Sequence, residues 1–482
     1  MNTRNSIALM ALVTVLGCAD SYVVMDPAGQ GANDAHPLPR AGWDAGGGPG
    51  QADAAPPDDP LNDSLQQFCE GGGAVVEVPG NHEVVYETCV GDLAETIFTN
   101  ALCTCNNAQL AGYLRTRGFD SREGAFEDDD EFGGGAPVGI NGAYTLGAGF
   151  TDVGGSFSVA GPEGLQFAGY LRVFGDLKIA GDVLLPGYAK VERDAWLAGN
   201  FTSGPLTIAR DLHQGGVVIA LPLDVGRNTV QAPVAVAPPC PCDDLLDIAG
   251  LIDQLRRNND NAVNGVQVDA LRQSLGSIEV RLPCGRYYLS EISGVGEIVV
   301  RVEGRVALAV SGTVAAAGSL RFELEDDAEI DLFIGGDLGL IGAARFGDEA
   351  RPAATRIYVA GESDIALVGA SAFVGNLYAP NAVVTAPGYL RAYGSFFARD
   401  FNVPGYAHIA YDRAVTDLDC DDDPDEPPPP ENDVPEGYNC DLCGDCFDGL
   451  ACFDSRCQPC QEDRNCCSQQ VCEAGRCVNL VR

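Results

Sequence analysis

The sequence predicts a mainly β protein: a parallel β-solenoid body with short helical segments, followed by a small disulfide-rich module. Short runs of β-forming residues, separated by Gly, Asn, Asp or Pro, recur about every twenty residues. The phrase "GYLRVFGDLKIAGDVLLPGYA" at 169–189 returns in similar form as "GYLRAYGSFFARDFNVPGYA" at 388–407. Ten of the 19 cysteines lie between Cys440 and Cys477. A phrase used twice indicates a building unit, because a catalytic motif is normally used once.

The N-terminus has the features of an export signal. Arg4 precedes an apolar run at 7–16 that is too short to span a bilayer. The following "VLGC", Val15–Cys18, resembles the lipobox of bacterial lipoproteins. This resemblance implies a signal peptide over 1–17, cleavage before Cys18, and an outer-membrane lipoprotein held by the acylated cysteine, facing the periplasm or the cell surface. The alternative is an ordinary secretion signal with an incidental cysteine, which also exports the chain.

Charge and cysteine content restrict the partners and the compartment. The 29 basic and 69 acidic residues give a net charge of −40, which repels nucleic acid and anionic lipid headgroups. We therefore expect no nucleic-acid partner. Outside the cytoplasm, cysteines are expected in disulfides, and with Cys18 set aside both remaining groups are even. Eight lie in the body: Cys69, Cys89, Cys103, Cys105, Cys240, Cys242, Cys284 and Cys420.

Two segments read as linkers. The stretch 18–66 is rich in Gly, Ala, Pro and Asp and cannot bury enough apolar surface to offset its conformational entropy. We expect a disordered, lipid-anchored tether there. The stretch 416–439 is acidic and proline-rich, so charge repulsion predicts an extended spacer.

The body lies between these linkers. It divides into an N-terminal part of the solenoid with a short helix (67–239), a helical insertion (240–276) and a C-terminal part of the solenoid (277–415). "DLAETIFTNAL" at 92–102 has capping-box spacing between Asp92 and Glu95. "DDLLDIAGLIDQLRR" at 243–257 has apolar residues at helical spacing, with Asp243 or Asp244 as the expected N-cap. The sequence leaves open whether the solenoid continues through the insertion.

The repeated phrase predicts which side chains point into the solenoid. Each coil turns three times, and Gly, Asn and Asp tolerate the backbone angles of such corners. A third fragment, "AGYLRTRG", starts at Ala111. The alternate apolar positions expected to face inward are Leu171 with Leu390, Val173 with Ala392, Leu177 with Phe396, Ile179 with Ala398, Val183 with Phe401, and Leu185 with Val403.

Several stretches together resemble a family of bacterial surface β-solenoid domains. They are "LPCGRYYL" (Leu282–Leu289), "AEIDLFIGGDLGLIG" (Ala328–Gly342), "RIYVAG" (Arg356–Gly361) and the segment from "FVGNLYAPNAVV" to "IAYD" (Ile409–Asp412). Such domains recur in exported lipoproteins and adhesin-like proteins and have no assigned molecular function. The resemblance implies a solenoid exposed at the envelope and supplies no catalytic residues.

The tail from 440 to 482 reads as a disulfide-stapled module. A segment of this length cannot build an adequate apolar core, so covalent cross-links must hold it. The phrase "CQPCQEDRNCCSQQVCEAGRC" resembles the cysteine-rich modules named after Dickkopf. The alternative is a zinc site from Cys440, Cys443 and Cys446. The disulfide candidates are Cys440, Cys443, Cys446, Cys452, Cys457, Cys460, Cys466, Cys467, Cys472 and Cys477.

A search for catalytic motifs is negative at the level of sequence. The four histidines are scattered, and no zinc-protease, nucleophile-elbow or P-loop motif occurs. His408 aligns with Lys190 and is expected at a solvated repeat position. Asp194 and Asp412 recur with the repeat and are expected as turn salt bridges or caps. The acidic runs 127–131 and 417–426 lack EF-hand spacing, so we expect solvated charge there, with calcium as the alternative and no cofactor.

We therefore expect a non-enzymatic envelope lipoprotein that displays a solenoid and a disulfide module for adhesion or for contacts with an envelope protein or glycan. The repeat tyrosines Tyr170, Tyr188, Tyr389 and Tyr406 are expected either to form an exposed ladder that binds a ligand or to cap the solenoid corners. One alternative is a polysaccharide lyase or hydrolase, which would need two carboxylates, or a base and Ca²⁺, facing one groove. Another is a self-assembling structural scaffold.

Overall fold

The computed structural model describes most of the body and short pieces elsewhere. The described residues are 65, 68–69, 76–79, 85–88, 94, 96–127, 134–243, 245–340, 343–367, 372–416, 451–453, 456–458, 470–473 and 476–479. Cys18, the signal peptide, nearly all of both linkers and the carboxylates at 417–426 lie outside them. The chain forms two compact units, one containing the body and one containing the C-terminal module, and each is described by itself.

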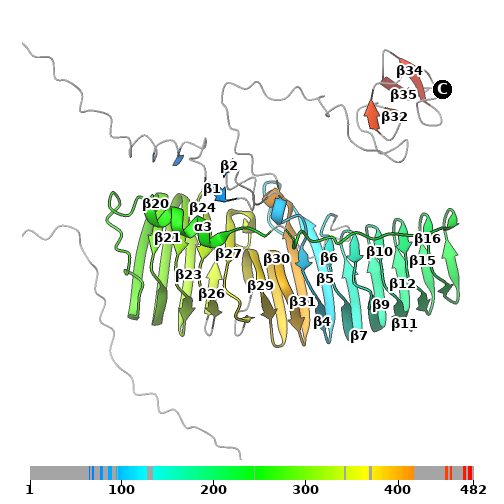
Figure 1. Cartoon of the computed structure of the whole chain (residues 1–482), viewed down its shortest axis with the longest axis horizontal. Helices are drawn as coiled ribbons and strands as arrows, with labels where there is room; N and C mark the ends of the chain where they lie inside the picture. Colours follow the sequence, from blue (N-terminus) through cyan, green and yellow to red (C-terminus); the bar gives the residue numbers. More distant parts are fainter. Residues whose placement is uncertain are drawn as a thin grey trace, which may run out of the picture. The chain divides into compact units, whose positions relative to one another are not determined.

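The body is a parallel β-solenoid, as the sequence predicts (Figure 1). Every described strand of the solenoid pairs in parallel with a strand of a neighbouring coil. Each coil has three sides, which we call faces A, B and C in chain order. Many sides are strands of only three residues, in which the first and third side chains point inward. An alternation of apolar residues over three positions is therefore enough to predict such a side.

Face A is formed by β3 (Leu102–Thr104), β6 (Val138–Ile140), β8 (Phe157–Val159), β10 (Leu177–Ile179), β13 (Ala195–Leu197), β16 (Leu212–Gln214), β19 (Thr229–Gln231), β24 (Glu329–Ile334) and β27 (Thr355–Val359). Face B is formed by β4 (Ala108–Leu110), β11 (Val183–Leu185), β14 (Phe201–Ser203), β17 (Val218–Ile219), β22 (Val314–Ala316), β25 (Leu338–Leu340) and β28 (Ile365–Ala366). Face C is formed by β5 (Tyr113–Phe119), β12 (Tyr188–Val191), β15 (Leu206–Ile208), β18 (Leu223–Val225), β23 (Ser319–Leu324), β26 (Ala343–Phe346) and β31 (Tyr406–Asp412). Longer strands continue around the corners: β7 (Tyr144–Val153), β9 (Leu165–Val173), β20 (Ser274–Leu289), β21 (Ile292–Val310), β29 (Phe373–Thr385) and β30 (Tyr389–Val403).

The two repeated phrases adopt the same conformation. Each passes from face C through face A to face B, and each of the twelve side chains expected to face inward is at most 4% exposed. These residues belong to a single apolar core that runs through the solenoid. The phrase is therefore a coil-building unit, and the prediction of its inward positions is confirmed.

The coils do not stack in the order of the sequence. The first half, β3 to β19, starts in the middle of the solenoid and coils outward to one end (Figure 1). The second half, β20 to β31, starts at the other end and coils back to the middle. There, β30 pairs with β3 and β4, and β31 pairs with β5. We call this contact between the last coil and the first coil the seam.

The chain returns from one end to the other through residues 232–247, which we call the return segment. Two disulfides, Cys103–Cys240 and Cys105–Cys242, join it to the first coil. The side chain of Asn141 both donates to Cys240 O and accepts from Cys240 N, at 2.9 and 3.0 Å. The sequence left open whether the solenoid continues through the insertion. In the structure the two halves form one stack of coils, but the coils that meet at the seam are far apart in the sequence.

The helix α3 (Ile248–Arg257) follows the return segment and packs against β20, β21 and β24 (Figure 1). Ile248, Leu251, Ile252 and Leu255 form its buried face. The expected N-cap at Asp243 or Asp244 is wrong: Asp247 caps the helix by accepting from Gly250 N at 2.9 Å. The helix starts later because Leu246 N donates to the Tyr378 hydroxyl at 3.1 Å, which holds that residue outside the helix.

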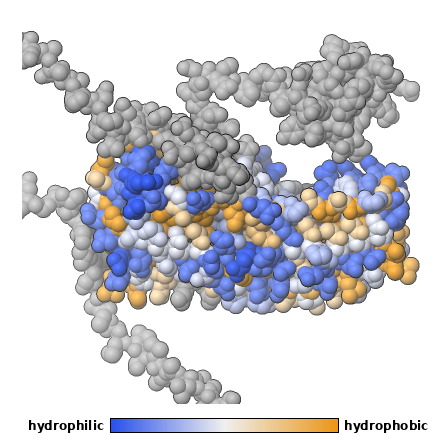
Figure 2. Space-filling view, viewed as in Figure 1, coloured by the Kyte–Doolittle hydropathy of each residue, from blue (hydrophilic) through white to orange (hydrophobic). Residues whose placement is uncertain are grey.

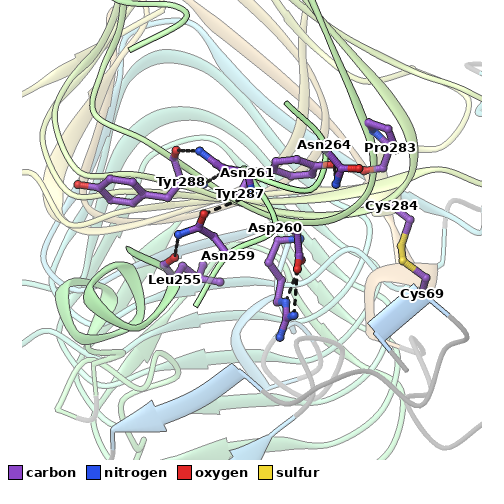
Figure 3. Close-up of polar contacts among 11 residues, drawn as sticks. Cys69, Leu255, Asn259, Asp260, Asn261, Asn264, Pro283, Cys284, Tyr287 and Tyr288 are labelled. Atoms are coloured by element: carbon purple, nitrogen blue, oxygen red, sulfur yellow. Dashed lines mark hydrogen bonds and ion pairs between the residues drawn. A yellow bond between two sulfur atoms is a disulfide. The ribbon is translucent and has the colours of Figure 1, made fainter. Parts of the chain in front are cut away.

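Residues after α3 cover part of the first coil of the second half (Figure 3). Asp260 N donates to Arg286 O, and Asn261 bonds both the N–H and the carbonyl of Tyr288. Ser290 N donates to Val268 O at 2.8 Å. The disulfide Cys69–Cys284 joins this coil to an N-terminal residue (Figure 3).

Smaller elements complete the body. Ala94, Thr96 and Ile97 are helical, with Phe98 N donating to Ala94 O, so the helix expected over 92–102 ends well before Leu102, which begins β3. The pair β1 (Val76–Pro79) and β2 (Val85–Thr88) is antiparallel. Two 3-10 helices, η1 (Pro352–Ala354) and η2 (Arg413–Thr416), contact each other. Among the described residues, no helix has the length and apolar character needed to cross a bilayer.

In the C-terminal unit, the described residues form two antiparallel hairpins. β32 (Ala451–Phe453) pairs with β33 (Arg456–Gln458), and β34 (Gln470–Glu473) pairs with β35 (Arg476–Asn479). Cys452 is in register with Cys457, and Cys472 with Cys477. The other six candidate disulfide cysteines of this unit lie outside the described residues.

Candidate ligand-binding face

The repeat tyrosines line up on face C. Backbone register places one aromatic residue at the same position in six successive coils: Tyr389, Tyr406, Tyr113, Phe150, Tyr170 and Tyr188. We call this row the aromatic ladder. It crosses the seam, since its first two members belong to the second half of the solenoid and the other four to the first half. For four of these tyrosines the sequence left open an exposed ladder or caps of the solenoid corners; the structure shows a ladder and adds Tyr113 and Phe150 to it.

A glycine precedes every member of the ladder, and at five of the six positions the close approach of a neighbouring coil leaves no room for a Cβ; the exception is Gly388, whose φ of +102° itself favours glycine. A Cβ on Gly149 would overlap the carbonyl oxygen of Gly112, and a Cβ on Gly187 would overlap that of Gly169. The motif Gly-aromatic is thus a tight corner followed by an outward-pointing ring. The "AGF" at 148–150 carries the same signal with Phe in place of Tyr, and it could have been found from the sequence.

The rings stack on one another along part of the ladder. Tyr113 stacks on Tyr406 at 4.5 Å and on Phe150 at 4.6 Å between ring centroids. Tyr170 stacks on Tyr188 at 5.4 Å. In these five residues, ring faces are therefore partly used within the ladder. Tyr389, Tyr406 and Phe150 are 49, 48 and 37% exposed, so the surface is richest in accessible aromatic area beside the seam.

Burial raises the pKa of two tyrosines of the ladder. It raises the pKa of Tyr113 above 10.0, and the neighbouring Tyr389 raises it further. Burial likewise raises the pKa of Tyr170. A neutral phenol both donates and accepts hydrogen bonds, so the ladder presents a row of uncharged polar edges near neutral pH.

A row of polar and charged side chains runs beside the ladder, two residues further along each strand. Its members are Arg391, His408, Arg115, Asp152, Arg172 and Lys190. Asp152 forms an ion pair with Arg117 at 2.5 Å, and Glu192 bridges Arg172 and Lys190. Burial opposes ionisation of Glu192, but the hydrogen bond and the charge of Lys190 lower its pKa below 4.5. The row thus combines fixed charges of both signs.

His408 is not at a solvated position, contrary to expectation. It is 4% exposed, and its ring lies 5.9 Å from that of Phe126. Residues 120–127 follow β5 and bring Phe126 over this part of face C, next to Phe119 and Tyr393. The alignment with Lys190 could not show this, because the covering residues 120–127 belong to another coil, far from His408 in the sequence.

Face A carries a second stack, which lies outside the repeated phrases. Lys178 Nζ lies 5.2 Å from the ring centroid of Trp196, and Trp196 stacks on His213 at 5.2 Å with the planes 3° apart. The three residues occupy the same position in successive coils. Their spacing of 18 and 17 residues, equal to the local coil length, was the available signal.

The repeated aspartates have structural roles. Asp194 Oδ1 accepts from Asp211 N at 2.8 Å and Asp211 Oδ1 from Asn228 N at 2.8 Å, so these residues form a ladder of corner caps. Asp412 is fully buried and accepts from the backbone N–H groups of Ser121, Ala353 and Ala414. The two do not occupy equivalent surroundings, because Asp412 lies under η1 and Asp194 at a partly exposed corner.

The strongest buried charge cluster is also structural. Arg356 donates to both carboxylate oxygens of Asp331, at 2.6 and 2.7 Å, and to Glu329 at 2.8 Å. Burial opposes ionisation of Glu329, but the charges of Arg356 and Arg305 lower its pKa below 4.5. Both carboxylates are occupied by arginine, which suits a structural ion pair.

One depression of about 260 Å³ lies on face B and is lined by polar side chains, including Asn107, Gln109, Thr145, Glu163 and Gln166. Glu163 is its one carboxylate. Within the described part of the chain, no cluster of three His, Cys, Asp or Glu residues could hold a metal ion.

Comparisons with known proteins give one family match and one match to a solved structure. No curated protein matches the chain. Among solved structures, the crystal structure of an ice binding protein from an Antarctic bacterium, Flavobacteriaceae, matches with a TM-score of 0.18 and 8% sequence identity, over 67% of this chain and 98% of that chain. Residues 241–418, which contain α3 and the second half of the solenoid, match the family described as a domain of unknown function (DUF7305).

Proposed function

We propose that this protein is an exported, lipid-anchored display protein whose solenoid binds an extended glycan chain along the aromatic ladder without cleaving it. The observation that carries the proposal is the ladder itself: six aromatic residues at one position of six successive coils. Five intervals of about 4.8 Å make a strip of roughly 24 Å along the solenoid axis.

The chemistry of the strip suits a sugar polymer. A glycan has apolar C–H patches between hydroxyl groups, and tyrosine edges combine an apolar ring with a hydrogen-bonding tip. The neighbouring row of Arg, Asp and Lys side chains adds donors and acceptors within the same strip. Because the rings are already stacked, they lose little conformational freedom on binding, which favours affinity.

Other features support export and display. The three described disulfides are typical of an oxidising compartment. The lipobox-like Val15–Cys18 supports anchoring through Cys18.

The proposal is tested by titrating the full chain with cellohexaose, chitohexaose and hexa-galacturonate in a calorimeter. We expect saturable binding of at least one, weakened tenfold or more in the Tyr389→Ala/Tyr406→Ala variant. Leu184→Ala is the matched control, because Leu184 is 55% exposed on face B, away from the ladder. Incubation with the bound glycan should release no new reducing ends.

Three outcomes would contradict the proposal. Absence of binding to every glycan would remove the ligand class and favour a protein partner. An equal loss of affinity in the Leu184→Ala control would remove the ladder from the site. New reducing ends would favour the polysaccharide-degrading alternative.

A further inference from the structure

The end of the solenoid formed by the last coil of the first half is unusually apolar. Val217, Ile219, Leu221 and Leu223 are 61, 56, 82 and 42% exposed, and Val230 is 39% exposed. Figure 2 shows hydrophobic residues at the surface of this end, at the right of the view. Clustered exposed apolar residues of this size normally mark an interaction surface.

The same end has unpaired strand edges on all three faces. Among the described residues, β17 pairs only with β14, β18 only with β15, and β19 only with β16. Pro222 O accepts a hydrogen bond from β15, and Gly226 N donates one to it. Because successive residues of a strand direct their backbone N–H and C=O groups to opposite sides, those of Leu223 and Val225 point away from the solenoid. Asn228 O and Ala232 N bond to β16, which leaves Thr229 and Gln231 in the same situation. Such edges are templates for further β pairing.

The shape of this edge selects its partner. Three short strands surround one triangular section, and their edges can be paired together only by another coil of the same outline. Neighbouring coils here repeat every 17 residues, as Leu212 with Thr229 and Leu206 with Leu223. The opposite end has a different outline: β20 and β21 are 16 and 19 residues long, and residues 260–271 bond along part of that coil.

Charge also permits two copies to meet at this end. The chain carries a net charge of −40, so most of its surface repels a second copy. Residues 217–231 contain one acidic residue, Asp224, and one basic residue, Arg227, and are therefore neutral. The segment that would form the contact therefore adds no net charge of its own to the repulsion between two copies.

We propose that two copies of this chain dimerise end to end through this coil, with β17, β18 and β19 of each copy pairing antiparallel across a two-fold axis. A two-fold contact matches the triangular outline to itself and closes, so it makes a dimer and not a filament. The dimer would double the length of the solenoid and place two aromatic ladders on one particle. It does not depend on the ladder binding a glycan.

The test is the mass of the full chain, kept in a mild detergent, measured by light scattering and sedimentation over a wide concentration range. We expect the mass of the wild type to rise to twice the monomer value. The Ile219→Lys/Leu221→Lys variant should self-associate at least tenfold more weakly, because it places charge on the edge. Leu184→Lys is the control, since Leu184 is equally exposed on face B but two coils inside the end, and it should dimerise like the wild type.

A second variant keeps the test decisive if the lysine variant folds poorly. Thr229→Pro removes one outward-facing N–H while leaving the inward bonds of β19 in place. It should lower dimerisation and leave the circular dichroism spectrum unchanged. The proposal would be overturned if the wild type stayed monomeric at all concentrations or grew beyond a dimer. It would also be overturned if the Leu184→Lys control lost dimerisation as much as the Ile219→Lys/Leu221→Lys variant.

Discussion

Tyr113 and Tyr406 stack across the seam with their ring centroids 4.5 Å apart, although they belong to opposite halves of the solenoid. Both follow a corner glycine, and both lie in copies of the same short phrase. The repeat therefore serves two purposes. It builds each half, and it makes the last coil of one half a matching partner for the first coil of the other.

The corner glycines should be intolerant of any side chain. We expect Gly149→Ala to lower the free energy of unfolding by about 1–3 kcal/mol, because its Cβ would overlap the carbonyl oxygen of Gly112. Gly339→Ala is the control, since a Cβ there meets its nearest neighbour at 3.7 Å, an ordinary contact. Chemical denaturation followed by circular dichroism measures both. Equal stability of the two variants would contradict close packing of the corners.

The Arg356 cluster should stabilise only as a complete set. We expect Asp331→Asn to cost about 3–5 kcal/mol of unfolding free energy, because it leaves the buried guanidinium without its main partner. Arg257→Met on α3 is the comparison. Its ion pair with Asp253 is solvent-exposed and screened by water, so its loss should change the unfolding free energy far less. If both substitutions cost the same, the Arg356 cluster is not the buried pair described here.

Asp412 should make stability depend on pH in a defined direction. Burial raises its pKa above 3.8 despite three backbone N–H donors. The folded state therefore holds the proton more tightly than the unfolded state. The contribution is fully present below pH 3.8 and is lost as pH rises through the folded pKa.

The matching measurement is unfolding free energy against pH for the wild type and for Asp412→Asn. The difference between the two should decline with rising pH in this window and then level off. Asp326→Asn, at an exposed turn, should run parallel to the wild type. A flat difference between wild type and Asp412→Asn would show that the raised pKa is wrong.

The two disulfides to the return segment should protect it from opening. We expect the Cys103→Ala/Cys240→Ala variant to lose about 2–5 kcal/mol and to become sensitive to proteases within 232–239. Limited proteolysis with mass spectrometry locates the cuts. The Cys69→Ala/Cys284→Ala variant should leave this segment resistant, because that bridge joins a different coil. Cuts elsewhere in both variants would place the weak point outside the return segment.

The sequence by itself determined the fold class and the inward positions. Side-chain alternation such as Leu177 and Ile179 around Lys178 follows from local strand geometry, and corner glycines such as Gly187 follow from close coil contacts. These are short-range constraints that each coil repeats, so a repeat in the sequence suffices to reveal them. The tyrosines of the ladder were visible for the same reason.

Only the tertiary structure decided the order of the coils, the burial of His408 and the nature of the ends. All coils present similar edges, so pairing rules do not specify which coil stacks on which, and the seam depends on the path of the return segment held by Cys103–Cys240 and Cys105–Cys242. His408 is buried by a loop from a coil far away in sequence. Such relationships depend on long-range contacts, which no local pattern of residues records.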